Sequence, residues 1–302
     1  MTCNRPNPQF EPLAEGLLVR APAKLNLSLL IAGKRPDGFH EIETVMAKID
    51  WYDELRIQPG PPGIDLICNG PHWAPGGQDN LVYRAAAEAF RAAGRSDGVR
   101  LTLTKNVPAG SGLGGASSDA AAALIGLNRQ FDLRLSMRQL AEVAARLGSD
   151  VAFFLGGPLA FCTGRGEKTK PLPGRFDFTA MLVLPDINVS TAEVYAHYTH
   201  DAKEYERLNR LAGDHLANGR IDLLSEMCAN MLETSCYRVC AELGRLKNAV
   251  ESLGLGPVCL SGSGSTLYIV ARDSDSRSLD LARDRVTGET ACRCVVVRNN
   301  PW

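Results

Sequence analysis

Hydrophobic and polar positions alternate along the first hundred residues in the pattern of half-buried β-strands. Leu25, Leu27 and Leu29 point to one side of a predicted strand over 18–31, and the polar residues between them point to the other. Further strands are predicted over 41–50, 54–58, 64–68 and 99–103, with a proline- and glycine-containing turn at 35–38. Residues 1–16, with their three prolines, are expected to form an irregular lead-in. This part of the chain is therefore predicted to be rich in β-structure.

Helical patterns interrupt and follow these strands. Asp79 or Asn80 is expected to cap a helix that ends at Gly94, and Ser136 with Gln139 forms the pattern of a capping box. The later elements are predicted strands at 159–162, 180–184, 258–260, 266–271 and 292–297 and predicted helices at 117–130, 136–148, 203–211, 221–233, 237–253 and 276–286. This order predicts an α+β fold with mostly antiparallel sheets, because a regular alternation of buried strands and helices is absent.

The length of 302 residues is large for one compact core, so two domains are expected. The composition loosens in the loop-rich stretch 156–174, which predicts one domain over 1–165 and a second over 166–302. The last strand is the element that we expect to be able to pack back on the first domain.

Charge and composition argue against several classes of protein. The 33 basic and 34 acidic residues give a formal net charge of −1, which implies no broad basic surface for nucleic acid. No stretch approaches the roughly 18 to 20 apolar residues of a membrane helix, and the N-terminal residues lack the apolar core of a secretory signal. We expect a cytoplasmic protein that acts on neither nucleic acid nor membrane.

The nine cysteines are expected to be reduced thiols that pack as small core residues, because their number is odd and no CxxC occurs. A zinc site built from Cys236, Cys240, Cys292 and Cys294 is the alternative. His197 and His200 are expected to be solvated helix residues rather than a metal pair.

The strongest chemical pattern is a glycine-rich run between a predicted strand and a predicted helix, VPAGSGLGGASSD over 107–119. Glycines let backbone N–H groups converge on phosphate oxygens, and Ser117 or Ser118, expected to open the helix, offers a hydroxyl to phosphate or to Mg²⁺. Lys105 precedes the run at a position that suits a nucleotide contact. The predicted ATP-binding residues are Lys105, Pro108, Ala109, Gly110, Ser111, Gly112, Leu113, Gly114, Gly115, Ala116, Ser117 and Ser118.

Other interpretations of the run remain open. Gly110, Gly112 and Gly115 have the GxGxxG spacing of a dinucleotide fingerprint, so an NAD(P)-binding oxidoreductase is one alternative. That fingerprint normally follows a buried parallel strand, whereas the strand at 99–103 is amphipathic. The P-loop of nucleoside triphosphatases does not fit, because no Gly-Lys-Ser/Thr closes the run. A non-catalytic nucleotide sensor and a bare flexible loop are the remaining alternatives.

The segment 108–118 resembles the phosphate-binding signature of the GHMP kinases, the family of galactokinase, homoserine kinase, mevalonate kinase and phosphomevalonate kinase. Four other segments are similar to a branch of that family that phosphorylates a cytidine diphosphate sugar alcohol in the non-mevalonate route to isoprenoids. They are AKLNL at 23–27, GKRPDGFHE at 33–41, LGSDV at 147–151 and LSGSGS at 260–265. The resemblance implies a two-domain GHMP kinase fold, with an N-terminal domain like domain 2 of ribosomal protein S5, a C-terminal α+β domain, and the active site in the cleft between them.

The resemblance also implies roles for residues outside the run. Asp150 stands where the family has its catalytic aspartate, and Lys24 pairs with it and with the substrate hydroxyl. The residues alone favour a helix N-cap at Asp150 and a solvated strand face at Lys24, and the resemblance reverses that interpretation. The family usually has Ala-Asp-Val-Pro where this chain has SDVA at 149–152, a change that loosens the turn and keeps the carboxylate.

Two aromatic residues are implied to hold the cytosine ring of the substrate. Phe39 stands beside His40 where the family usually has tyrosine, so it keeps the stacking face and loses a hydroxyl, and Tyr195 is the second ring. The implied substrate contacts are Asn26, Phe39, His40, Asp150, Thr191, Tyr195, Gly262 and Ser263.

The implied reaction moves the γ-phosphoryl group of ATP, with Mg²⁺, to the 2-hydroxyl of this small-molecule substrate, with Asp150 as base assisted by Lys24. The enzyme is expected to act as a monomer or a weak homodimer. Another GHMP kinase, for homoserine, mevalonate or a sugar, is the alternative. The aromatic residues argue against it, because those substrates carry no base to stack.

Overall fold

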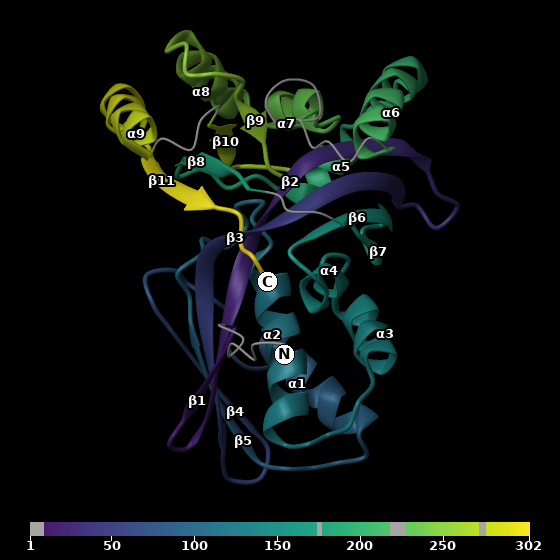
Figure 1. Ribbon diagram of the computed structural model, residues 1–302. Helices are drawn as coiled ribbons and strands as arrows, with labels where there is room; N and C mark the ends of the chain where they lie inside the picture. The colour runs from purple at the N-terminus through teal and green to yellow at the C-terminus, as the bar shows by residue number, and fades with distance from the viewer. Residues whose placement is uncertain (1–8, 174–176, 218–227, 272–275) are drawn as a thin grey trace, which may run out of the picture.

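The computed structural model describes residues 9–173, 177–217, 228–271 and 276–302, which form two β-sheets covered by helices (Figure 1). The large sheet has the order β1–β2–β3–β5–β4, with β6 paired to β3 and β7 paired to β6. The small sheet has the order β11–β8–β10–β9. Of the strand pairs described, β4 with β5 is parallel and the others are antiparallel, which agrees with the predicted α+β class.

The strands have the following bounds. The large sheet contains β1 (Phe10–Leu13), β2 (Gly16–Lys34), β3 (His40–Pro59), β4 (Ile64–Asn69), β5 (Val99–Thr104), β6 (Leu159–Gly164) and β7 (Lys168–Pro171). The small sheet contains β8 (Thr179–Leu184), β9 (Cys259–Leu260), β10 (Leu267–Val270) and β11 (Arg293–Arg298).

The helices fall into two groups in space. The first group, beside the lower part of the large sheet, contains α1 (Leu81–Ala92), α2 (Gly115–Gln130), α3 (Met137–Leu147) and α4 (Val151–Leu155), preceded by the 3-10 turn η1 (Gly77–Asp79). The second group contains α5 (Thr191–Ala196), α6 (Ala202–Ala217), α7 (Glu233–Val239), α8 (Ala241–Ser252) and α9 (Ser276–Thr290). Of these, α6, α7, α8 and α9 line the top of the molecule beyond the small sheet (Figure 1). No helix in the described part of the chain combines the length and the apolar composition needed to cross a bilayer.

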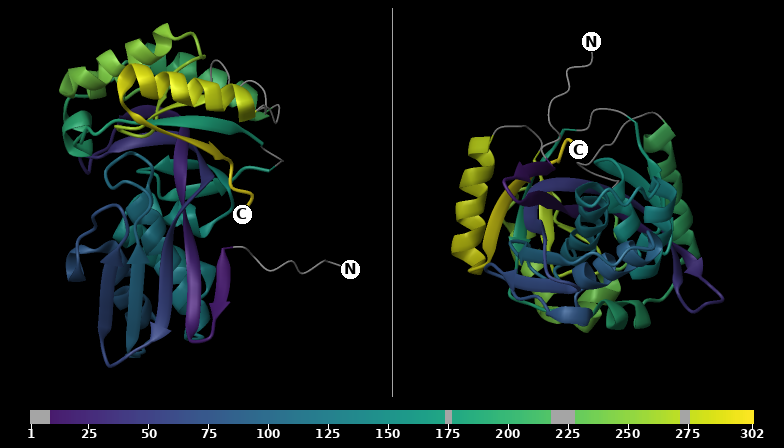
Figure 2. Two further views of the ribbon diagram at one scale, coloured as in Figure 1. Left: turned by 90° about the vertical axis from the view of Figure 1, so that its left-hand side faces the viewer. Right: turned by 90° about the horizontal axis from the view of Figure 1, so that it is seen from below.

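The long strands β2 and β3 run through both halves of the molecule (Figure 2). Two separate strands, 41–50 and 54–58, were expected in place of β3, and that expectation is wrong. Tyr52 stays paired with Pro22 and Asp53 with Ala21, and the pairing shifts register between Pro22 and Lys24 without ending β3. The alternation of apolar and polar residues fails to predict a strand through Asp53, because a charged residue suggests an exposed turn. In the structure its carboxylate is buried and accepts hydrogen bonds from two backbone N–H groups.

The helix after the glycine-rich run begins earlier than expected. Gly114, in the left-handed conformation with φ of 71°, is the N-cap, and α2 starts at Gly115. Ser117 and Ser118 therefore lie inside the first turn and do not cap it. The sequence pattern favoured serine as the cap, but the left-handed turn at Gly114 starts the helix without a side-chain bond.

Several short elements were not predicted. Residues 10–13 form β1 on the edge of the sheet, where Pro12 is tolerated, although an irregular lead-in was expected there. The elements α4, α5, α7 and β7 are too short to show a clear periodicity. The helix expected at 221–233 lies mainly outside the described residues, and 228–232 are not helical.

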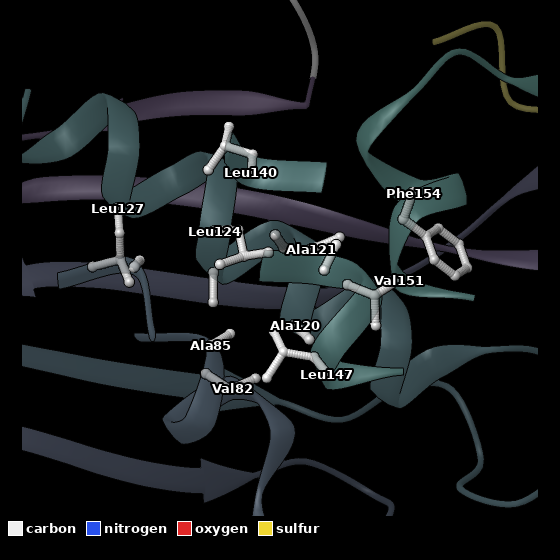
Figure 3. Close-up of a cluster of buried hydrophobic side chains, with 14 of the residues drawn as sticks. Val82, Ala85, Ala120, Ala121, Leu124, Leu127, Leu140, Leu147, Val151 and Phe154 are labelled. Carbon is white, nitrogen blue, oxygen red and sulfur yellow. The ribbon is translucent and has the colours of Figure 1, made fainter. Parts of the chain in front are cut away.

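Helix α2 is the centre of the lower core. Its alanine-rich sides let α1, α3 and α4 approach closely, as Figure 3 shows for the side chains around it. The buried residues labelled there are Val82, Ala85, Ala120, Ala121, Leu124, Leu127, Leu140, Leu147, Val151 and Phe154. This packing holds the N-terminus of α2, and the glycine-rich run before it, in a fixed position.

The C-terminal residues return to the large sheet after β11. Asn299 forms a bridge with Ile49, and the backbone N–H of Asn300 donates to the carbonyl of Lys48 at 2.9 Å. The N–H of Arg298 donates to Asp50 Oδ1 at 2.7 Å. The end of the chain thus ties the small sheet to β3.

Candidate active site

The glycine-rich run lies where the two halves of the molecule meet. Gly112 has a φ of 79°, and a Cβ atom there would lie 2.2 Å from the carbonyl oxygen of Ser261. The hydroxyl of Ser261 donates to the Gly112 carbonyl at 3.0 Å, and the N–H of Thr266 donates to the Ser111 carbonyl at 3.1 Å. Only glycine permits this contact, so the run and the turn at 261–265 form one backbone surface.

Lys24 and Asp150 approach each other beneath that surface. The ammonium of Lys24 donates to the Gly112 carbonyl at 2.8 Å and to Asn26 Oδ1, and lies 3.8 Å from Asp150 Oδ2. Lys24 thus donates two hydrogen bonds and forms an ion pair with Asp150, so its ammonium has partners on three sides. Burial lowers the pKa of Lys24, and the nearby Asp150 carboxylate opposes that shift.

Asp150 occupies the N-cap position of α4, yet its side chain makes no capping hydrogen bond. The side chain is 29% exposed, whereas that of Lys24 is 4% exposed. The carboxylate is therefore held near a buried cation while one side stays open to a ligand. The cap interpretation, which the sequence also allowed, does not account for this orientation.

Asn26 belongs to the same arrangement. Its side-chain amide donates to Thr44 Oγ1 at 2.9 Å, and the Thr44 hydroxyl donates to the carbonyl of Ser28. Its backbone carbonyl accepts from the buried Tyr268 hydroxyl at 2.9 Å. These bonds hold this face of β2, and with it the ammonium of Lys24, in place.

Aromatic side chains gather at a distance from the glycine-rich run. The rings of His40 and Tyr195 stack at 5.3 Å between centroids, and Tyr198 meets His40 edge-on at 5.6 Å. Phe39 is 53% exposed, and the Arg165 guanidinium covers one face of its ring at 4.9 Å. Burial, together with the charges of Lys34 and His200, lowers the pKa of His40, which favours a neutral imidazole.

A cavity of about 720 Å³ joins these features. Thr191, whose hydroxyl lies 2.7 Å from that of Ser263, is on its wall. The cavity brings together these residues predicted from the sequence: Lys24, Asn26, Phe39, His40, Gly112, Gly114, Asp150, Thr191, Tyr195, Gly262 and Ser263. Segments from distant parts of the chain thus meet around one space.

A second cavity of about 520 Å³ lies along the other part of the same run. It is lined by residues 108–111, by residues 184–188 and by the exposed Trp73. Two polar atoms on its lining residues, His72 Nε2 and Thr266 Oγ1, are buried and have no hydrogen-bond partner. The glycine-rich run therefore separates two spaces, and both have room for parts of ligands.

The chain is similar to known proteins of one family, in both halves of the molecule. The model of the GHMP kinase N-terminal domain matches residues 80–158, and that of the GHMP kinase C-terminal domain matches residues 213–286. A 4-diphosphocytidyl-2-C-methyl-D-erythritol kinase of Bacillus pumilus is 40% identical over 83% of this chain and 87% of its own length. The chain belongs to the GHMP kinases, in the branch of the 4-diphosphocytidyl-2-C-methyl-D-erythritol kinases.

Other relatives agree with this assignment. The enzyme of that name from a Geobacillus strain is 37% identical over 85% of this chain and 89% of its own. A crystal structure of 4-(cytidine 5'-diphospho)-2C-methyl-D-erythritol kinase has a TM-score of 0.75 and 32% identity, and covers 94% of this chain and 99% of that one. A homoserine kinase from Cytophaga hutchinsonii, at 16% identity and a TM-score of 0.75, covers 98% of each chain and shows the shared fold alone. The GHMP kinase fold expected from the resemblance is confirmed.

Lys105 differs in its surroundings from what the sequence suggested for an ATP contact. It is buried, lines neither cavity, and forms ion pairs with the carboxylates of Asp53 and Asp119. Asp53 also accepts the backbone N–H groups of Asn106 and Val107 at 2.6 and 2.8 Å. Lys105 therefore stabilises the start of the run indirectly. Its ammonium neutralises the buried carboxylate of Asp53, which accepts the backbone N–H groups there.

The remaining residues of the run have different exposures. Gly115 sits directly above Lys105, Leu113 is buried, and its carbonyl accepts the N–H of Lys24 at 2.9 Å. Ala116 is exposed, Ser117 is half-buried and Ser118 is buried. The run is therefore open at Ala116 and Ser117 and closed at Leu113.

Sequence reasoning missed several residues of the site. Arg165 and Lys34 line the larger cavity, and His72 and Trp73 line the smaller one. Arg165 stands between two glycines, a pattern that could have marked it as part of a tight functional turn. Trp73 is a large aromatic in a loop rich in proline and glycine, which could have indicated a ligand contact.

The metal and cysteine alternatives find no support in the described residues. These contain no group of three His, Cys, Asp or Glu side chains that could hold a metal ion. The eight cysteines among them are free thiols, and that of Cys236 donates to the carbonyl of Ser263 at 3.3 Å.

Proposed function

We propose that this enzyme transfers the γ-phosphoryl group of ATP to the 2-hydroxyl of 4-diphosphocytidyl-2-C-methyl-D-erythritol, a step in isoprenoid precursor synthesis. The observation that carries the proposal is the cavity that has Lys24 and Asp150 near the glycine-rich run and a group of aromatic rings farther along. The names and identities of the relatives support the same substrate.

ATP is proposed to lie along the glycine-rich run, with its nucleoside in the 520 Å³ cavity. The unpaired His72 Nε2 and Thr266 Oγ1 offer hydrogen bonds there, and Trp73 offers a stacking surface. The triphosphate would follow the run toward Gly114, where the N-terminal N–H groups of α2 attract anions. This arrangement points the γ-phosphate at the cavity that contains Asp150.

The acceptor hydroxyl is proposed to lie against Asp150. As its oxygen bonds to the γ-phosphorus and the bond from that phosphorus to the β–γ bridging oxygen breaks, the hydroxyl proton passes to Asp150 Oδ2 or Oδ1. The Lys24 ammonium, 3.8 Å from Asp150 Oδ2, attracts the negative charge of the carboxylate. Its fixed position also places positive charge near the oxygen atoms that exchange the phosphoryl group.

The cytosine ring is proposed to lie among Phe39, His40 and Tyr195. His40 already stacks on Tyr195 and Arg165 covers one face of Phe39, so the base would use the faces that these contacts leave open. The neutral imidazole of His40 can accept or donate one hydrogen bond at the edge of the base.

Mg²⁺ fits this site as an ion that is held mainly by the triphosphate. The described residues contain no group of three His, Cys, Asp or Glu side chains that could hold a metal ion, while the half-buried Ser117 and the unpaired hydroxyl of Ser118 lie in the first turn of α2. These hydroxyls are the protein groups that would hold the ion. When bound, Mg²⁺ neutralises phosphate charge during transfer.

We also propose that the enzyme works in the cytoplasm, as a monomer or a weak homodimer. The free thiols of the described cysteines support a reducing compartment. Sedimentation velocity over a range of protein concentrations tests the state of association.

The function is tested with purified enzyme, ATP and Mg²⁺ against a panel of acceptors. We expect phosphorylation of 4-diphosphocytidyl-2-C-methyl-D-erythritol and none of homoserine, mevalonate or galactose. Asp150→Asn and Lys24→Met should each lower kcat by roughly 10²-fold or more while ATP binding stays close to that of the wild type. Asp132→Asn, an exposed carboxylate paired with Arg134, is the control. A preference for another acceptor would refute the substrate, and a large loss of ATP affinity would refute the roles of Asp150 and Lys24.

A further inference from the structure

Arg165 lies in a tight turn between β6 and β7, and its backbone is held in place by carboxylates. Glu167 Oε2 accepts the N–H of Arg165 at 2.6 Å, and Glu41 Oε1 accepts the N–H of Gly164 at 3.0 Å. Next in the chain, Gly166 is so close to the Asp150 carboxylate that a Cβ atom there would lie 3.3 Å from Oδ1. The turn is therefore a fixed part of the wall beside Asp150.

The guanidinium of Arg165 interacts with a carboxylate only at long range, since its charge contributes to the lowered pKa of Asp37. It lies 4.9 Å from the centroid of the Phe39 ring, and within the described ranges no acidic side chain is at ion-pair distance from it. The nearby acids are otherwise engaged, since Asp37 and Glu41 form ion pairs with Arg35. Arg165 thus keeps its five N–H donors for another ligand.

Lys34 is a second cation on the wall of the same cavity. It ends β2 opposite His40 in the strand pairing, and the structure, as far as it is described, shows no ion pair for it. Its charge also contributes to the lowered pKa of His40, which agrees with its position near the imidazole. Two cations without acidic partners in a cavity of this kind favour an anionic ligand.

The order of contacts along the wall is informative. Phe39 contacts Arg165, Arg165 is followed by Gly166, and Gly166 lies so near Asp150 that an added Cβ would be 3.3 Å from Oδ1. In a nucleoside diphosphate that is esterified to an alcohol, the base, the diphosphate and the acceptor hydroxyl follow in the same order. The guanidinium therefore lies between the wall proposed for the base and the carboxylate proposed for the hydroxyl, where the diphosphate of such a ligand would lie.

We infer that Arg165, with Lys34 beside it, is a specificity-determining residue that binds the diphosphate linking the base to the acceptor alcohol. The inference rests on the proposed function, and it explains how the enzyme distinguishes a nucleotide-linked alcohol from a free one. A planar guanidinium forms paired, charge-assisted hydrogen bonds with phosphate oxygens. The guanidinium stacks on the Phe39 ring, and this contact orients its N–H groups before the substrate binds.

The experiment compares wild type, Arg165→Ala, Arg165→Lys and Lys34→Ala, with CDP, CMP and cytidine as competitors of the substrate. Arg84→Ala, on the exposed side of α1, is the matched control. In Arg165→Ala we expect the inhibition constant of CDP to rise roughly 10- to 100-fold, while that of cytidine changes by less than about threefold. Arg165→Lys should keep part of the preference for CDP, because it keeps the charge. Lys34→Ala should also raise the inhibition constant of CDP, but by a smaller factor, because the ammonium of the exposed Lys34 is more strongly hydrated than a guanidinium.

The outcomes separate the inference from the proposed function. Wild type could phosphorylate the substrate while Arg165→Ala raises the inhibition constants of CDP and cytidine by the same factor. In that case Arg165 acts only by covering Phe39, and the inference is wrong. An unchanged preference for CDP in Arg165→Ala would also overturn it. If wild type neither phosphorylates the substrate nor binds CDP, the proposed function itself fails. The KM for ATP, expected to be unchanged in all variants, reports whether the glycine-rich run is intact.

Discussion

Replacement of Gly112 by alanine should separate the two backbone turns that meet at the candidate active site. The new Cβ would lie 2.2 Å from the Ser261 carbonyl oxygen and 2.9 Å from that of Gly264, so the turns must part by about 1 Å to restore ordinary contact. Strain at a φ of 79° costs about 1–2 kcal/mol, and the forced contact adds about 1–3 kcal/mol. We therefore expect a loss of about 2–5 kcal/mol in the free energy of unfolding.

Gly110→Ala is the matched control for this change. Its φ of 69° gives similar backbone strain, but a Cβ there meets only the side-chain oxygen of Asn188, at 3.3 Å, which can move away. Reduced flexibility of the unfolded chain affects both variants alike and cancels in the difference. Gly110→Ala should lose only about 1–2 kcal/mol.

Urea unfolding and steady-state kinetics measure the two effects. Besides the larger loss of stability, Gly112→Ala should lower kcat by roughly 10²-fold, because the carbonyl that positions the Lys24 ammonium moves. Gly110→Ala should retain a kcat within about tenfold of wild type. Equal losses in the two variants would refute the argument that the close approach of Gly112 to the turn at 261–265 sets the geometry of the site.

Three further predictions follow from individual side chains. Phe39→Leu should raise the KM for the substrate by roughly 5- to 100-fold through lost stacking, with kcat and thermal stability nearly unchanged, because the ring is on an exposed turn; an unaltered KM would contradict a stacking role. ATP with Mg²⁺ should change the fluorescence of the exposed Trp73 saturably, and Trp73→Phe should abolish the change; persistence in that variant would place the nucleoside elsewhere. Burial lowers the pKa of Lys48 to about 8 from an ordinary value of 10.5. The unfolded chain therefore binds more protons between these values, and the free energy of unfolding should gain a contribution on the order of 3 kcal/mol as the pH rises through this window. Lys48→Met should lack this pH-dependent gain in urea titrations at pH 7.5 and 10; an identical pH dependence in the variant would contradict it.

The local pattern of the chain was sufficient for most of its regular elements. The alternation around Leu25, Leu27 and Leu29 predicted β2, and the capping box at Ser136 and Gln139 predicted the start of α3. Both depend on neighbours within a few residues, so the sequence carries the information directly. The division of β3 into two strands was wrong because the Asp53 carboxylate is bonded by residues 52 to 54 positions away.

The sequence alone also located the glycine-rich run and, through the family resemblance, the separate segments that contain Lys24, Phe39 and Asp150. It could not show which of their side chains meet. Lys105 adjoins the run in the sequence, yet its ammonium lies beneath it in a buried ion pair. Arg165, which carried no periodic pattern, lies between Phe39 and Asp150 in space.

The contact between Gly112 and Ser261 shows why this limit exists. The preference of glycine for positive φ is local and can be predicted from composition, but the hydrogen bond between these residues spans 149 positions. Such a contact depends on how two sheets and their helices pack, which no short segment encodes. The sequence thus determined most of the long strands and helices and the position of the glycine-rich run, whereas tertiary packing decided that the run faces Lys24 and Asp150 on one side and a second cavity on the other.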